Sequence, residues 1–176
     1  MGLNLLAWAA LAYFVGALPI DYIIVRLFGP SRSHPLDKTN VLSFLIEVAK
    51  GAALAWLAAH YAWSAYGMTV AGVAVVAGAS FSFWQGKRGS ATLGAAVGAL
   101  AVAVPLALIA VTIAWALVFV LVRQPDTVTL VAASLAPLAA ALLHDPPAAL
   151  LMALGVCVVV FASVALHLRH SGNLVQ

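Results

Sequence analysis

Charged residues are scarce in this chain: Asp, Glu, Lys and Arg together make up 7% of its 176 residues, whereas hydrophobic residues make up 65%. A soluble domain has roughly 25% charged and 45–50% apolar residues. The shortage of charge excludes a soluble protein, a disordered chain and a nucleic-acid-binding domain built on a basic face. The composition that remains is that of an integral membrane protein.

Cysteine is scarcer still, because the chain has only one, Cys157, inside the apolar run 150–166. A single cysteine forms no internal disulfide and makes no metal site by itself. A secreted disulfide scaffold is therefore excluded, and we expect Cys157 to pack among apolar side chains. No metal and no cofactor are expected.

Apolar runs of membrane-spanning length make up most of the sequence. The runs cover residues 3–27, 41–66, 69–84, 90–122, 127–143 and 147–168. About 20 apolar residues span a hydrocarbon core of roughly 30 Å. The first run has no positive residue before it and exceeds the roughly 7–15 residues of a signal-peptide core, which predicts a retained span.

The run 90–122 is too long for one helix, and Pro105 removes a helix hydrogen bond near its middle. Splitting this run gives an all-α, single-domain protein (residues 1–176) with seven transmembrane helices. The loop cations support that count because they follow only odd-numbered helices: Arg26, Arg32, Lys38, Lys87, Arg88, Arg123 and Arg169. Since Lys and Arg in short loops collect on the cytoplasmic side, we expect the N-terminus outside and the C-terminus in the cytoplasm.

Most other polar residues gather on that same side, in segments 29–40, 85–92, 123–129 and 167–173. The stretch Gly86-Lys87-Arg88-Gly89-Ser90 opens a predicted helix. Glycines let backbone N–H groups approach an anion, the helix start adds positive potential, and the two cations neutralise the anion. The stretch therefore fits a phosphate group, although such a loop also carries cations for orientation alone.

Several polar residues on this side admit two interpretations. Ser33, Thr39 and Asn40 either donate to the same anion or cap the start of a helix. His170 acts either as a general base or as a cation near a helix C-terminus. His167 lies one turn earlier, but two histidines without a third ligand do not make a metal site.

Two residue pairs inside the predicted helices have structural interpretations. Glu47 and Lys50 lie one turn apart, so they can neutralise each other. Gly94 and Gly98 form a small-xxx-small pair, which favours close packing of their helix on a neighbour.

Taken in order, these segments resemble the bacterial acyl-phosphate:glycerol-3-phosphate acyltransferases, a seven-helix membrane family, over nearly the whole chain. In the first half, the matching stretches are Gly16-Ala17-Leu18-Pro19 (Gly-Ser-Ile-Pro in the family), Ser33 with Thr39-Asn40-Val41-Leu42 (the Ser and Thr-Asn-Val-Leu of its first motif) and Glu47 to Gly51 (Asp-x-x-Lys-Gly). In the second half, they are Gly86 to Thr92 (Gly-Gly-Lys-Gly-Val-Ala-Thr), Thr129 (the second serine of Ser-Leu-Ala-Ser) and Arg169-His170-x-x-Asn173 (Arg-His-x-x-Asn-Ile).

The chain departs from the family pattern at several positions. His34 to Asp37 replace the glycine-rich part of the first motif, Ser43 replaces an arginine, and Ala79 replaces a histidine. Arg88 stands at a lysine position, where a guanidinium fork replaces a point charge.

The resemblance implies direct acyl transfer from an acyl phosphate to glycerol-3-phosphate, in a bacterial cytoplasmic (inner) membrane, with no covalent enzyme intermediate and no cofactor. The implied catalytic residues are Ser33, His170 and Asn173. The implied substrate-binding residues are Thr39, Asn40, Lys50, Gly86, Lys87, Arg88, Gly89 and Thr129. Within this set, Ser33, Gly86, Arg88 and Thr129 hold the acyl phosphate, and glycerol-3-phosphate docks near Lys50, His170 and Asn173.

The expected partners are the two small-molecule substrates and membrane lipids, with no nucleic acid and no identified protein partner. A second function class fits the lost glycines and the lost arginine: a non-catalytic homologue that acts as a membrane scaffold or lipid-binding partner. A transporter fits poorly, because charge away from the inner face is limited mainly to Asp21 and the Glu47/Lys50 pair.

Overall fold

The computed structural model describes residues 2–28, 38–62, 64, 66–81, 90–122, 125–143 and 145–172. Within these residues the chain forms eight helices and no strand, which confirms the all-α prediction. The helices are α1 (Gly2–Gly16), α2 (Ile20–Phe28), α3 (Lys38–Tyr61), α4 (Gly67–Ser80), α5 (Ser90–Ala103), α6 (Pro105–Val122), α7 (Pro125–Leu142) and α8 (Pro147–Gly172).

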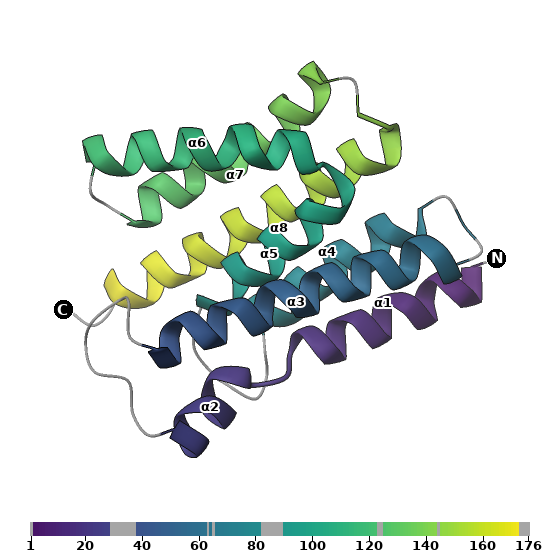
Figure 1. Ribbon diagram of the computed structural model, residues 1–176, viewed down its shortest axis with the longest axis horizontal. Helices are drawn as coiled ribbons and strands as arrows, with labels where there is room; N and C mark the ends of the chain where they lie inside the picture. Colours follow the sequence, from purple (N-terminus) through teal and green to yellow (C-terminus); the bar gives the residue numbers. More distant parts are fainter. Residues whose placement is uncertain are drawn as a thin grey trace.

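The long helices lie roughly side by side along the length of the bundle and alternate in direction (Figure 1). Helix α3 packs between α1 and α5, while α8 packs against both α4 and α7. Helices α6 and α7 form a hairpin at one side of the molecule. The starts of α3, α5 and α7 and the ends of α4, α6 and α8 all point toward the same end of the bundle, on the left in Figure 1. The predicted polar segments therefore adjoin helix ends that share one end of the molecule.

Large apolar side chains cover the outside of the bundle. Leu121 is 82% exposed and Leu27 is 71% exposed, and α6 presents Leu106, Ile109 and Ile113 outward along its length. Two helices, Asn40–Tyr61 and Pro147–Leu166, are long and apolar enough to cross a membrane, and five shorter apolar helices accompany them. Exposed apolar area of this extent indicates contact with lipid.

Glycines bring helix backbones into direct contact. A Cβ atom on Gly98 of α5 would collide with the backbone of Val48 and Ala52 of α3, and one on Gly51 would collide with the backbone of Ala95. The close packing predicted for the Gly94/Gly98 pair is confirmed. Small residues at helix interfaces are typical of membrane bundles, where van der Waals packing replaces the hydrophobic effect between helices.

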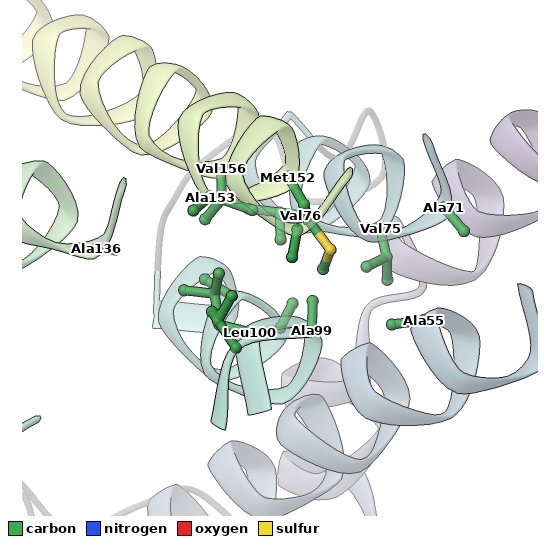
Figure 2. Packing of buried hydrophobic residues seen from close by; sticks show 14 of the residues in the cluster. Ala55, Ala71, Val75, Val76, Ala99, Leu100, Ala136, Met152, Ala153 and Val156 are labelled. Atoms are coloured by element: carbon green, nitrogen blue, oxygen red, sulfur yellow. The ribbon is translucent and has the colours of Figure 1, made fainter. Parts of the chain in front are cut away.

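The centre of the core lies between α4, α5 and α8. Figure 2 shows Met152 projecting from α8 toward residues of α4 and α5. Met152 is fully buried, and the absence of a side chain at Gly72 makes room for its terminal methyl group. Alanine and valine supply most of the surrounding side chains, so the helices approach one another closely.

Helices break at both Pro19 and Pro105, but only the break at Pro105 was predicted. Pro105 does split the run 90–122 as predicted, because α5 ends at Ala103 and α6 begins at Pro105. The prediction of one continuous helix over residues 3–27 was wrong, because the chain breaks at residues 17–19 into α1 and α2. Pro19 has no N–H to donate to Val15 O, which accepts instead from the Leu18 amide at 3.3 Å. Eight helices rather than seven follow from this break.

Candidate polar site at one end of the bundle

Four polar residues lie along one face of α3. Asn40, Ser43, Glu47 and Lys50 follow one another at spacings of three, four and three residues, which places them in a line on the helix surface. Asn40 is exposed, whereas Ser43 and Glu47 are buried. The line therefore leads from the first turn of α3 into the interior of the bundle.

The inner part of that line is an ion pair. The Lys50 Nζ atom lies 2.8 Å from each of the two carboxylate oxygens of Glu47, and it donates a hydrogen bond to Oε1. The same ammonium donates a second hydrogen bond, 3.0 Å long, to the backbone carbonyl of Gly16. The Lys50 and Glu47 side chains are 8% and 2% exposed. The predicted mutual neutralisation is confirmed, and the Gly16 carbonyl is a further partner that the sequence did not indicate.

The first turn of α5 contributes a buried hydroxyl. Thr92 is 4% exposed, and its Oγ1 atom has no hydrogen-bond partner among the residues that the structure describes. Buried polar atoms without partners are rare, so each one indicates either strain or an unseen ligand. Sequence reasoning included Thr92 in the glycine-rich motif but did not select it as a site residue. Its position directly after the Gly86–Ser90 stretch was the signal that could have identified it.

Thr129 lies in the first half of α7, one residue after the fully buried Val128, and is itself buried. Helix α7 packs against α6 and α8, whereas α3 packs against α1, α2, α4 and α5. Thr129 and the α3 polar line therefore lie on helices with different neighbours. What they share is the end of the molecule toward which α3 and α7 begin.

Several predicted site residues lie outside the described residues: Ser33, Gly86, Lys87, Arg88, Gly89 and Asn173. Thr39 lies in the first turn of α3 and His170 in the last turn of α8, and only their backbones are described. The first turn of α3 and the last turn of α8 point toward the same end of the bundle as the start of α5. The segments predicted to form one site are therefore attached to helix ends on one side of the molecule.

Comparison with known sequences gives a consistent result. Residues 36–176 match the protein family described as glycerol-3-phosphate acyltransferase. The chain is 32% identical to the glycerol-3-phosphate acyltransferase of Jannaschia sp. (strain CCS1), over 94% of this chain and 85% of that protein. It is 31% identical to the protein of the same name from Gloeobacter violaceus, over 95% of this chain and 87% of the other.

Comparison with solved structures gives the same fold. The chain is similar to PlsY (YgiH), described as an integral membrane glycerol 3-phosphate acyltransferase, in its glycerol 3-phosphate form, with a TM-score of 0.78 and 21% identity. It is also similar to the lysophosphatidic acid form of PlsY, with a TM-score of 0.80. Each match covers 97% of this chain and more than nine-tenths of the other.

Proposed function

This chain belongs to the glycerol-3-phosphate acyltransferase family, and on that premise we propose that it transfers an acyl chain from an acyl phosphate to glycerol-3-phosphate. The products are lysophosphatidic acid and inorganic phosphate. The observation that carries this proposal is the similarity to enzymes of that name, which extends along nearly the whole chain. The apolar exterior of the bundle supports a membrane enzyme that meets its acyl donor within the lipid phase.

The proposed topology has seven crossings, in which α1 and α2 together form the first. The N-terminus then lies outside, and the end of α8 lies on the cytoplasmic side of a bacterial inner membrane. Supporting this orientation, the loop cations follow helices that end toward one end of the bundle.

In the proposed reaction, a hydroxyl oxygen of glycerol-3-phosphate attacks the acyl carbon of the acyl phosphate. The bond from that carbon to the phosphate oxygen breaks, phosphate leaves with the electron pair, and His170 accepts the hydroxyl proton. Ser33, Gly86, Arg88 and Thr129 hold the phosphate of the donor. Positioning of the two substrates and neutralisation of their charge supply most of the rate enhancement.

Glycerol-3-phosphate docks in this proposal near the cytoplasmic ends of α3 and α8. Asn40 is exposed in the first turn of α3 and presents an amide that donates to phosphate or hydroxyl oxygens. Thr39, Lys87 and Gly89 belong to the same binding set, and Asn173 orients the acceptor. Lys50, the remaining residue of the predicted set, lies deeper along the same face of α3. No metal and no cofactor take part.

The second candidate is a non-catalytic homologue that serves as a scaffold or lipid-binding partner. One observation favours it: Ser43, at the arginine position of the family motif, lies buried in the α3 polar line and offers no positive charge there. The loss of that charge weakens any phosphate site built on α3.

An assay with both substrates separates the two candidates. The protein, purified and reconstituted in lipid vesicles, is supplied with acyl phosphate and glycerol-3-phosphate, and lysophosphatidic acid is measured. We expect product only when both substrates are present, with one phosphate released per acyl chain transferred. Absence of product from correctly inserted protein would leave the scaffold as the function.

A further inference from the structure

The break between α1 and α2 leaves backbone groups that a continuous helix would satisfy. In a continuous helix the Ile20 amide would donate to Gly16 O, four residues earlier. Here the Ile20 amide donates to Leu18 O at 2.9 Å instead. The Gly16 carbonyl therefore needs another donor, because an unsatisfied carbonyl in an apolar interior costs free energy.

Lys50 supplies that donor from α3. Its ammonium reaches Gly16 O at 3.0 Å, although the two residues are 34 positions apart in the sequence. Glu47 lies one turn earlier on α3 and neutralises the ammonium, so that the charge is tolerated where the side chain is almost fully buried. The ion pair thus links α3 to the C-terminal end of α1.

This link lies at the point where the chain leaves α1, because α1 ends at Gly16. Lys50 lies near the middle of α3, so α1 ends about halfway along that helix. Helix α2 then packs along the first half of α3, with Ile24 buried. In sequence, α2 leads directly into residues 29–37 and then into the first turn of α3, the part of the chain that carries Ser33, Thr39 and Asn40.

We propose that Lys50 is a positioning residue, held by Glu47, which fixes the α1–α2 break and thereby the position of α2 relative to α3. Its consequence for catalysis rests on the proposed function, but its structural consequence does not. The alternative is that Lys50 binds glycerol-3-phosphate directly. Its side chain is only 8% exposed, and its ammonium already donates to Gly16 O and to Glu47 Oε1, with Glu47 Oε2 at 2.8 Å. Burial and these contacts favour the positioning role.

The first experiment measures the position of α2 relative to α3 and needs no activity. Cysteines at the exposed residues Tyr22 and Leu45, in a Cys157→Ser background, carry spin labels whose separation is measured in vesicles. We expect Glu47→Gln/Lys50→Met to shift or broaden the distance distribution, and Lys50→Arg to preserve it. The double variant leaves no unpaired buried charge, so it remains informative if Lys50→Met alone does not fold.

Two further variants sharpen this measurement. Exchange of the pair, Glu47→Lys/Lys50→Glu, keeps an ion pair on α3 but places a carboxylate toward Gly16 O, so we expect the same shift as in the neutral double variant. Thr69→Val is the matched control, because it removes another side-chain bond to a backbone carbonyl, from Thr69 Oγ1 to Ala148 O at 2.6 Å between α4 and α8. We expect this control to leave the distance unchanged. An unchanged distance in either pair variant would overturn the proposal.

The second experiment measures kcat and KM for glycerol-3-phosphate in the same variants. A misplacement of about 1 Å costs on the order of 100-fold in rate, so we expect kcat of Glu47→Gln/Lys50→Met to fall roughly 10- to 100-fold while KM for glycerol-3-phosphate changes little. Lys50→Arg should recover much of kcat. A large rise in KM with unchanged kcat and unchanged distance would show that Lys50 is a substrate ligand. Inactivity of the wild type together with a shifted distance would reject the proposed function and support the positioning role.

Discussion

Arg88 is the residue at which the catalytic and orientation interpretations diverge most. As a phosphate ligand it would make charge-assisted hydrogen bonds worth about 1.5–3 kcal/mol, so Arg88→Ala should reduce acyl transfer roughly 10- to 150-fold. Arg88→Lys should recover part of the rate, because it restores the charge but not the guanidinium fork. Acyl transfer by purified protein in vesicles is the measurement.

Lys87→Ala is a control for insertion alone, because it removes one cation from the same loop as Arg88→Ala does, while Lys87 itself belongs to the proposed substrate-binding set. Neither variant should change insertion or abundance, since one cation remains in the loop in each case. Equal rates for wild type and Arg88→Ala would assign Arg88 to orientation alone.

The buried hydroxyl of Thr92 gives a prediction about stability. With no hydrogen-bond partner in the described part of the chain, this group carries a desolvation penalty of about 1–3 kcal/mol. Thr92→Val replaces the hydroxyl by a methyl group of similar size, so we expect it to stabilise the substrate-free protein by about 1 kcal/mol. Thr69→Val should do the opposite, because the Thr69 hydroxyl is bonded to Ala148 O. Thermal unfolding in detergent measures both, and a loss of stability in Thr92→Val would mean that the hydroxyl has a partner.

Spacing along one helix predicted the Glu47–Lys50 pair, because residues three apart on a helix are neighbours whatever the tertiary fold. The bond from Lys50 to Gly16 O was beyond such reasoning. It depends on where α1 lies relative to α3, and α1 is placed by close glycine contacts with α4, at Gly16 against Val75 and at Gly78 against Tyr13. The burial of Thr92 also depends on helix packing, so the local sequence did not predict it.

At the scale of elements, the contact between α3 and α5 depends on Gly98. Alanine is a better helix former than glycine by about 1 kcal/mol, yet a Cβ atom at this position would strike the backbone of Val48 and Ala52. We expect Gly98→Ala to destabilise the protein by about 1–3 kcal/mol, as overpacking does elsewhere. Ala101→Ser, on the exposed side of the same helix, is the control and should change the unfolding temperature little. A Gly98→Ala protein as stable as wild type would show that the helices move apart freely.

The prolines show how far elements can be predicted from local sequence. Pro105 divides the run 90–122, whose length already predicted a break within it. Pro19 breaks a run of ordinary membrane-spanning length, while Pro137 lies inside α7 without ending that helix. Each of the three prolines lacks a backbone N–H, so this property alone does not decide whether a helix breaks. Near Pro19, the Gly16 carbonyl accepts a hydrogen bond from Lys50 of another helix, 34 residues away from Gly16, and no local pattern reveals this donor.

At the scale of the whole molecule, composition and charge placement predicted the helical membrane class and the gathering of polar segments at one end. Both depend on rules that act on the entire chain, such as hydrocarbon thickness and the cytoplasmic preference of Lys and Arg. Which polar segments touch was not predictable in this way. Helix α7, which carries Thr129, packs against α6 and α8, whereas α3 packs against α1, α2, α4 and α5, and no local sequence pattern indicates these neighbours.

The orientation of the molecule is tested by labelling its two ends. In a Cys157→Ser background, a cysteine introduced at Ser171 should react with a membrane-impermeant thiol reagent only when the cytoplasmic side is accessible. A cysteine at Gly2 should react only from outside, because in the proposed topology α1 and α2 together make one crossing. Labelling in intact cells and in inverted vesicles distinguishes the two sides. Reaction of both cysteines from one side would require an even number of crossings, and would then make α2 either a crossing of its own or a helix that turns back before the far surface.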